Sequence, residues 1–365
     1  MDNSTKLRVA IIGCGGMGRA HATVLQDLSG YELVAAADVF SQPLEEMRKV
    51  AGSIHLYADA DEMLSKERPA VVAVATAVKD HGATTLAALR AGAHVLCEKP
   101  LARTLQEADN MINCAAELGR LLLVHNEYNV SPRTLAALRL VQAGGIGQVI
   151  ALRGTFKGNF CGGWDIAEGA PHLFALAIQF AGAPRWVCSE IITQNRASME
   201  TDIFNGRVLP TVNAGWIVGD RIHAMIGFDA GVVMHAEFLG IKTNPHLLVI
   251  GTEGAVLVPY GASEALPLRC ANPNDPEAIW EPLEFTYGEY AGLPNANRRT
   301  VAIGYDHIAH WLSSEQSGEH PMSALHGRQA LEIIHGAYES HFQGGQRIAI
   351  PLLRRDHPLE RRIVS

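Results

Sequence analysis

Three glycines near the start of the chain have the spacing of a phosphate-binding loop. Gly13, Gly15 and Gly18 form a Gly-x-Gly-x-x-Gly pattern directly after an apolar run. In such a loop the first glycine permits a tight turn, the second lets the backbone approach a pyrophosphate, and the third lets a helix pack closely on a strand. The phosphates then face the free N–H groups and the positive end of that helix. The alternative is a plain glycine turn, because chance matches are easy in a chain with 35 glycines.

An acidic residue further along the chain favours the first interpretation. Asp38 lies 20 residues beyond Gly18, at the end of the next apolar run, where its carboxylate can accept hydrogen bonds from a ribose diol. The same charge repels a 2′-phosphate, and the next residues, Val39, Phe40 and Ser41, supply no cation to offset it. The pattern therefore predicts a dinucleotide site that prefers NAD to NADP.

A lysine that could act on a bound substrate follows a later apolar run. The expected strand His94–Glu98 is followed directly by Lys99 and Pro100. If this strand belongs to a parallel sheet, Glu98 and Lys99 stand at its carboxyl edge, where the ligands of such sheets bind. The alternative is a surface lysine in a turn before proline.

A histidine near the start of a helix is a candidate general base. Pro171 fits a helix only in its first turn, so the helix is expected to begin near Gly169, with His172 close to its amino end. That position disfavours the imidazolium and suits a base that works near neutral pH. Glu168, one turn earlier, either hydrogen-bonds to the other ring nitrogen or contacts a substrate hydroxyl. For any one of the 16 histidines, the alternative is a core residue with a satisfied hydrogen bond.

The elements that position the glycine loop and Lys99 alternate in type. From Leu7 to about Val124, short apolar runs alternate with longer amphipathic stretches, which predicts strand–helix units and a doubly wound parallel sheet over residues 1–126. The expected strands are Leu7–Gly13, Tyr31–Asp38, Ala70–Thr76, His94–Glu98 and Arg120–His125. The expected helices are Met17–Leu28, Leu44–Val50, His81–Ala91 and Leu105–Leu118.

The rest of the chain, residues 127–365, has the pattern of a second domain. A helix at Pro132–Ala143 ends in Gly144-Gly145, and strands with short connections then predict an open, mainly antiparallel sheet. The expected strands are Gln148–Phe156, Arg185–Thr193, Val212–Val218, Arg221–Phe228, Val232–Phe238, His246–Ile250 and Arg347–Leu352. The expected helices are Ala170–Ala181, Tyr305–Ser313 and His326–Gln343, and Tyr260–Asn297 is expected to be an irregular surface insertion.

Composition excludes several classes of function. The net charge of −8 on 365 residues, without a run of five basic residues, disfavours nucleic acid as a partner. Apolar runs shorter than the ~18 residues of a membrane span and the absence of a signal-peptide pattern predict a cytoplasmic protein without membrane contact. Six scattered cysteines without a CxxC pair predict reduced thiols, and His307-x-x-His310 lacks an acidic third ligand, so no metal is expected.

Three of these segments together resemble one protein family. The glycine loop, Ala75–His81 and Glu98-Lys99-Pro100, in this order and spacing, look like the Gfo/Idh/MocA family of NAD(P)-dependent sugar and polyol dehydrogenases. The resemblance covers nearly the whole chain, because Ser340–Pro351 with its Gly344-Gly345 turn looks like the C-terminal end of the family. It implies an α/β fold with a Rossmann domain and a second α/β domain with an open sheet, in a homodimer or homotetramer.

The resemblance also implies roles for single residues. In the family, the lysine of Glu-Lys-Pro lies beside the nicotinamide and the reacting carbinol, and the Lys-Pro bond is commonly cis. A second signature, a glycine-rich turn followed by Asp-x-Gly-x-His, corresponds to Gly162–His172, with Glu168 in place of the aspartate. Pro-Asn is replaced by Ala77-Val78, and Tyr128-Asn129 stands where an arginine is often found.

The function implied is NAD-dependent oxidation of a secondary hydroxyl of a sugar, sugar derivative or cyclitol. The catalytic residues expected are Lys99, His172 and Glu168. The cofactor-binding residues expected are Gly13, Gly15, Gly16, Met17, Gly18, Asp38, Thr76, His81, Glu98 and Lys99. The substrate-binding residues expected are Lys99, Arg153, Lys157, Asn159, Trp164, Asp165, Glu168 and His172.

Two other classes of function remain open on the same fold. One is redox-neutral glycosidase or lyase chemistry, in which tightly held NAD transiently oxidises the substrate and labilises a neighbouring bond. The other is a non-catalytic sensor that binds a dinucleotide. The presence of both Lys99 and His172 argues against the sensor, which needs neither.

Overall fold

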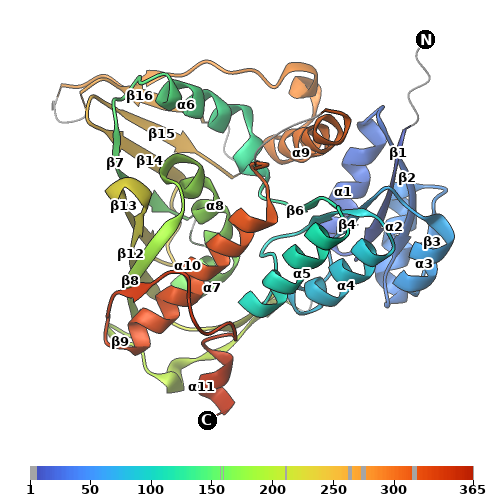
Figure 1. Ribbon diagram of the computed structural model, residues 1–365, viewed down its shortest axis with the longest axis horizontal. Coiled ribbons are helices and arrows are strands. Elements are labelled where there is room, and N and C mark those ends of the chain that lie inside the picture. The colour runs from blue at the N-terminus through green and yellow to red at the C-terminus, as the bar shows by residue number, and fades with distance from the viewer. Residues whose placement is uncertain are drawn as a thin grey trace. The chain divides into compact units, whose positions relative to one another are not determined.

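The computed structural model forms two compact units, and each is described by itself (Figure 1). The structure describes residues 6–156, 158, 160–209, 212–261, 265–272, 277–314 and 319–364. The first unit is Met1–Glu127 with Gly292–Arg328, and the second is Tyr128–Ala291 with Gln329–Ser365. The main boundary therefore falls one residue after the expected one, but Gly292–Arg328 groups with the first unit instead of the second.

The first unit contains a six-stranded, entirely parallel sheet in the order β3-β2-β1-β4-β5-β6. This confirms the doubly wound sheet expected from the buried apolar runs. Its strands are β1 (Leu7–Ile12), β2 (Tyr31–Ala37), β3 (His55–Tyr57), β4 (Val71–Val74), β5 (His94–Cys97) and β6 (Leu122–Val124). The order reverses between β1 and β4, so the turns that follow these two strands lie side by side at the carboxyl edge.

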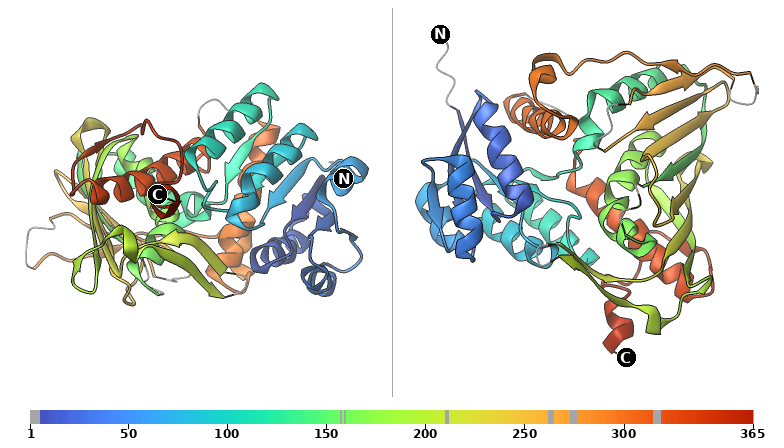
Figure 2. Two further views of the ribbon diagram at one scale, coloured as in Figure 1. Left: turned by 90° about the horizontal axis from the view of Figure 1, so that it is seen from below. Right: turned by 180° about the vertical axis from the view of Figure 1, so that it is seen from behind.

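Helices cover both faces of this sheet. They are α1 (Gly16–Asp27), α2 (Ser41–Ala51), α3 (Ala60–Glu67), α4 (Val78–Arg90) and α5 (Leu105–Glu117). α1 contacts α2, whereas α4 contacts both α3 and α5. The later helix α9 (Ala296–Ser313) packs beside α1 (Figures 1 and 2), which explains why a segment from the second half of the chain belongs to this unit.

The second unit contains a ten-stranded sheet in which β7 and β13 pair in parallel and every other pair is antiparallel. The expected mainly antiparallel sheet is thereby confirmed. Its strands are β7 (Val149–Thr155), β8 (Pro184–Thr193), β9 (Arg196–Ala197), β12 (Arg221–Phe228), β13 (Val233–Phe238), β14 (His246–Gly251), β15 (Ala255–Pro259), β16 (Leu268–Cys270), β17 (Glu281–Pro282) and β18 (Ile348–Ala349). A separate hairpin pairs β10 (Phe204–Leu209) with β11 (Val212–Ile217).

Helices α6 (Pro132–Gln142), α7 (Gly162–Glu168), α8 (Ala170–Ala181) and α10 (Ala324–Phe342) and the short α11 (Glu360–Val364) complete the structure. α8 is apolar on all sides, and each of its residues except Gln179 is buried. It packs on the inner face of the sheet, where Gly154 of β7 lies directly under Leu173. The outer face carries the alternate, exposed side chains of the same strands.

Several elements were not predicted from the sequence pattern, among them the strands β10 and β15 of the second unit. β3 and α3 form a half-exposed strand and a helix of eight residues, and β16, β17 and a 3-10 turn at Gly288–Gly292 lie inside the expected irregular insertion. Within the parts of the chain that the structure describes, no helix combines the length and the apolar character that a membrane crossing requires.

Candidate functional site

The glycine loop follows β1 and enters α1, as expected. Gly13 has a φ of +98° and lies against the backbone of Ala75 after β4, and a Cβ at Gly18 would collide with the Gly13 carbonyl. Around Gly15 and Gly16, by contrast, an added Cβ would meet no atom within 4 Å. Gly13 and Gly18 therefore allow the helix to pack closely on the strand, whereas Gly15 and Gly16 leave space beside the backbone.

The amino end of α1 has no side-chain cap among the described residues. Gly15 is the N-cap, and among the described residues no side chain caps the helix and no acidic residue occupies its first turn. The first N–H groups of a helix need partners, and the helix dipole favours a negative one. An uncapped helix end beside open space at two glycines fits a bound pyrophosphate.

Asp38 lies at the end of β2 and is held against this loop. Its Oδ2 accepts a hydrogen bond from the Cys14 N–H at 2.8 Å, and its Oδ1 accepts one from the Phe40 N–H at 2.9 Å. Arg19 donates a hydrogen bond to the Cys14 carbonyl at 2.8 Å. The carboxylate is thus oriented beside the glycine loop, with acceptor capacity left for a ribose diol.

His81 links two loops at the carboxyl edge of the sheet. Its Nδ1 lies 2.9 Å from the Pro100 carbonyl oxygen and its Nε2 lies 3.2 Å from the Thr76 carbonyl oxygen. Because burial opposes the charge but the Cys97 side chain and the two carbonyls favour it, the pKa of His81 is raised to about 9. Both ring nitrogens then donate, and His81 joins the turn after β4 to the cis peptide Lys99–Pro100. Its side chain therefore supports the cofactor edge.

Glu98 is buried at the end of β5 and is bonded within the protein. Its Oε1 lies 2.9 Å from His21 Nε2 on α1 and 2.7 Å from His125 Nδ1 after β6. Its Oε2 accepts a 3.3 Å hydrogen bond from the Lys99 N–H. Unlike the Asp38 oxygens, which accept one backbone N–H each, Oε1 of Glu98 already meets two imidazoles, and the carboxylate is buried. We therefore leave Glu98 out of the residues proposed to hold the cofactor.

Polar atoms at the same edge fit a bound dinucleotide. Thr76 Oγ1 after β4 and both side-chain polar atoms of Asn126 after β6 are buried without a hydrogen-bond partner among the described residues. Buried polar atoms are normally satisfied, so unpaired ones at the carboxyl edge of the sheet suggest a polar ligand. Asn126 was not predicted from the sequence, and Met17 is exposed in the first turn of α1, beside the loop.

In the second unit, the glycine-rich turn of the second signature begins a helix. The backbone N–H groups of Gly162 and Gly163 donate to the Asp220 and Gly219 carbonyls, and a Cβ at Gly163 would meet the backbone of Val218. α7 starts on this contact and leads through Gly169, which has helical dihedral angles, directly into α8. The expected start of α8 after Gly169 is confirmed, but a preceding helical turn covers that end, so the helix dipole acts less on His172 than an open end would allow.

His172 lies in the first turn of α8 and is 8% exposed. Its ring centroid is 4.8 Å from that of Tyr128, which in turn lies 5.8 Å from that of Tyr260. Tyr260 donates a hydrogen bond to the Thr155 carbonyl, and burial raises its pKa well above the ordinary value. Tyr128 and Tyr260 are functional candidates that the sequence analysis missed, although Tyr128 stood out as a departure from the family pattern.

The other expected substrate residues fall into three groups. Glu168 precedes His172 by four residues across the α7–α8 junction, and Trp164 and Asp165 are buried on α7. Arg153 is exposed on β7, on the face of the sheet opposite to the one that packs against α8, so the structure does not bring it to His172. Lys157 and Asn159 lie outside the residues that the structure describes.

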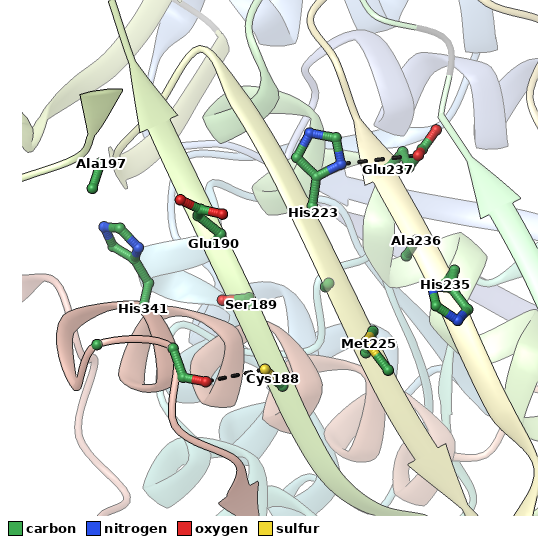
Figure 3. A pocket seen from close by; sticks show the side chains of 13 residues that line it. Cys188, Ser189, Glu190, Ala197, His223, Met225, His235, Ala236, Glu237 and His341 are labelled. Atoms are coloured by element: carbon green, nitrogen blue, oxygen red, sulfur yellow. Dashed lines mark hydrogen bonds and ion pairs between the residues drawn. The ribbon is translucent and has the colours of Figure 1, made fainter. Parts of the chain in front are cut away.

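A hollow of about 620 Å³ lies on that outer face (Figure 3). Side chains of three neighbouring strands line it. They are His223 and Met225 of β12, His235 and Glu237 of β13, and Cys188 and Glu190 of β8. His172, on the opposite face, does not line it. The hollow therefore belongs to an exposed sheet surface and not to the candidate site.

Comparisons with known proteins agree with this geometry. The family described as an oxidoreductase family with an NAD-binding Rossmann fold, Gfo/Idh/MocA, matches residues 7–126. An inositol 2-dehydrogenase of Rubrobacter xylanophilus is 30% identical over 258 residues, which are 67% of this chain and 73% of that protein. A D-apiose dehydrogenase of Paraburkholderia graminis is 33% identical over 168 residues, but the match spans only 46% of this chain and 44% of that relative.

Solved structures show the same fold along most of the chain. A levoglucosan dehydrogenase in complex with NADH and L-sorbose has a TM-score of 0.79 at 19% identity and covers 95% of this chain and 100% of its own. An NAD-binding oxidoreductase from Klebsiella pneumoniae has a TM-score of 0.77 at 21% identity, with 95% and 100% covered. With the glycine loop, Asp38 and the parallel sheet in place, the chain is a member of the Gfo/Idh/MocA oxidoreductase family, and its first unit is an NAD-binding Rossmann fold.

Proposed function

We propose that this protein oxidises a secondary hydroxyl of a sugar, sugar derivative or cyclitol with NAD. The observation that carries the proposal is the first unit, where an uncapped helix end, open space at Gly15 and Gly16, and an oriented Asp38 carboxylate together suit NAD. The relatives named as inositol and apiose dehydrogenases support this class of substrate.

Oxidation of a carbinol makes two demands on the protein itself. A base must take the hydroxyl proton, and a cation must stabilise the alkoxide that develops as hydride leaves for the nicotinamide, the group that bound NAD supplies. We assign the base to His172, with Glu168 supporting it, and the cation to Lys99. Trp164 and Asp165 remain proposed substrate contacts, and Tyr128 joins them because its ring lies against His172.

The test is a spectrophotometric screen in which the purified protein and NAD are mixed with a panel of sugars, sugar acids and cyclitols. NADH formation with at least one cyclic polyol is expected. Absence of NADH with every compound, or bond cleavage in which NAD is retained unchanged, contradicts the dehydrogenase assignment.

Cofactor preference is expected to depend on Asp38. Replacing Asp38 by Ser and Val39 by Arg removes the carboxylate that opposes a 2′-phosphate and adds a cation, so the ratio of kcat/KM values should shift toward NADP by about 100-fold or more. Val39→Arg alone is the matched control, with a smaller shift expected because the carboxylate remains. A wild-type protein that already prefers NADP would show that Asp38 does not set the preference.

We also propose that the protein is a homodimer or homotetramer that covers the outer face of the ten-stranded sheet. This face exposes Met225 and carries half-buried Leu248 and Leu257, apolar side chains that a second copy of the chain would cover. Sedimentation velocity at micromolar concentration should show an oligomer, and Met225→Glu should shift it toward the monomer. A wild-type monomer under these conditions would rule the assembly out.

The cytoplasmic location that the sequence analysis predicts stays a prediction.

A further inference from the structure

Three buried side chains of the first unit, His21, Glu98 and His125, form what we call the histidine–glutamate cluster. They come from α1, the end of β5 and the end of β6, and are 1%, 6% and 1% exposed. A carboxylate and two imidazoles are expensive to bury unless they satisfy one another. None of the three has a part in the proposed reaction, so their burial at the carboxyl edge needs another explanation.

Hydrogen bonds make the cluster a single unit. Both imidazoles meet the same oxygen of Glu98, at 2.9 Å from His21 and 2.7 Å from His125. Tyr305 of α9 lies with its hydroxyl 3.0 Å from the second ring nitrogen of His21, and Tyr31 of β2 donates to the Tyr305 carbonyl. If His21 Nε2 donates to Glu98, its Nδ1 accepts from Tyr305, which sets the tautomer of that ring.

The two histidines differ in charge. The pKa of His125 is raised to about 9, because the charges of Glu98 and Glu127 outweigh the burial that disfavours the imidazolium. Burial lowers the pKa of His21, and the charge on His125 holds the pKa of Glu98 well below its ordinary value. Near neutral pH the cluster is therefore an ion pair of Glu98 with His125, to which neutral His21 donates.

This ion pair adjoins Lys99. The Lys99 N–H donates to the second oxygen of Glu98, and the positive charge of Lys99 acts on His125, whose pKa it lowers. The titratable groups around His125 come from several elements. They are Glu98 and Lys99 after β5, Glu127 after β6, His21 on α1 and, through His21, Tyr305 on α9 and Tyr31 on β2.

We propose that the histidine–glutamate cluster positions Lys99, by holding the turn that carries it through the Lys99 N–H and by setting the charge that acts on its amine. Glu98 and His125 are positioning residues in this role, because they act through Lys99 and not on the substrate. The inference rests on the proposed function, in which Lys99 stabilises the alkoxide.

One possible ligand atom from each of His21, Glu98 and His125 lies within 4.8 Å of the other two, which is also compatible with a metal ion. Ligands about 2.0–2.2 Å from a tetrahedral zinc ion stand about 3.3 Å apart. The two N···O separations of 2.7 and 2.9 Å are instead ordinary for charge-assisted hydrogen bonds. We therefore assign the atoms to hydrogen bonds, and metal analysis belongs to the test.

The test uses the full-length protein with ¹⁵N-labelled histidine and lysine. In the wild type, the His125 ring should be doubly protonated at pH 8 and the His21 ring neutral. Glu98→Gln should leave His125 neutral at that pH, move the Lys99 side-chain signal, and lower kcat about 10- to 100-fold, with the Kd for NAD changed less than about threefold. The pH at which kcat reaches half its maximum should move as well, which loss of packing alone would not cause.

Glu67→Gln is the matched control. Glu67 also accepts hydrogen bonds from a histidine and a tyrosine, His55 and Tyr57, but on the exposed β3 side of the sheet. It should leave kcat, its pH profile and the Lys99 signal unchanged. If Glu98→Gln does not fold, His125→Gln serves instead, with the same expected changes in the Lys99 signal and kcat.

Three results would overturn the inference. The first is a neutral His125 ring at pH 8 in the wild type. The second is a Lys99 side-chain signal that is unchanged in the Glu98→Gln variant. The third is one equivalent of bound zinc or iron in the purified protein. Because the resonance measurements need no turnover, they decide the inference even if the substrate screen shows no NADH. Failure of that screen alone would count against the proposed function and not against the cluster.

Discussion

Replacement of Lys99 by methionine is expected to lower kcat about 100-fold or more while NAD still binds with nearly wild-type affinity. Methionine keeps the length of the side chain but removes the charge that stabilises the developing alkoxide. Loss of one such electrostatic group typically costs a factor of 10²–10³, or about 3–4 kcal/mol, in the transition state. Because the charge matters mainly when the alkoxide develops, the loss should appear in kcat more than in the binding of NAD.

Steady-state kinetics with the best substrate of the screen and fluorescence titration with NADH measure the two quantities. Lys49→Met is the matched control, because Lys49 is an exposed lysine of α2 that pairs only with neighbouring Glu46 among the described contacts. It should behave as the wild type. Near-normal turnover of Lys99→Met would remove Lys99 from the mechanism and leave the hydride step without an assigned cation.

The second large effect is expected at His172. If its neutral imidazole accepts the hydroxyl proton, the rate of oxidation should rise with pH through one ionisation and then level off. His172→Ala should abolish that ionisation and lower kcat about 100-fold or more, since general base catalysis contributes typically 10²–10⁴-fold. The measurement is the pH dependence of kcat and kcat/KM for both proteins.

Glu168→Gln is expected to do less damage than His172→Ala. An amide can still accept a hydrogen bond from the ring but cannot stabilise its charged form, so the ionisation should persist at a shifted pH. His310→Ala, at an exposed position on α9, controls for the general effect of losing a histidine. A His172→Ala protein that keeps its rate and pH profile would falsify the role and point to Glu168 or a bound water as the proton acceptor.

The first unit was predictable from the sequence because its signals are local. The last four residues of β1 are apolar and buried, the glycine loop follows them at once, and Asp38 comes directly after the next strand. The helix α8 was predicted with its observed bounds, because Pro171 in its first turn and an unbroken apolar stretch leave few alternatives.

Elements without such signals were missed. β3 has three residues and α3 has eight, too few to show a period. α7 begins at two glycines, which in isolation indicate a turn, and it is helical because those glycines let it pack against the backbone of 218–220. The grouping of α9 with the first unit depends on its contact with α1, which no local pattern records.

In the candidate site, too, residues in local motifs were predictable from the sequence, whereas their long-range contacts were not. The sequence by itself predicted a dinucleotide site at the glycine loop beside Asp38 and singled out Lys99 and His172 as candidates, because each stands in a short motif with its own chemistry. Only the tertiary structure decided that Glu98 joins His21 and His125, that Tyr128 lies against His172, and that Arg153 faces away from it. The contacts of Glu98 and Tyr128 join residues 27 to 77 positions apart, and the place of Arg153 depends on which face of the sheet its strand presents. Strand pairing and helix packing settle both.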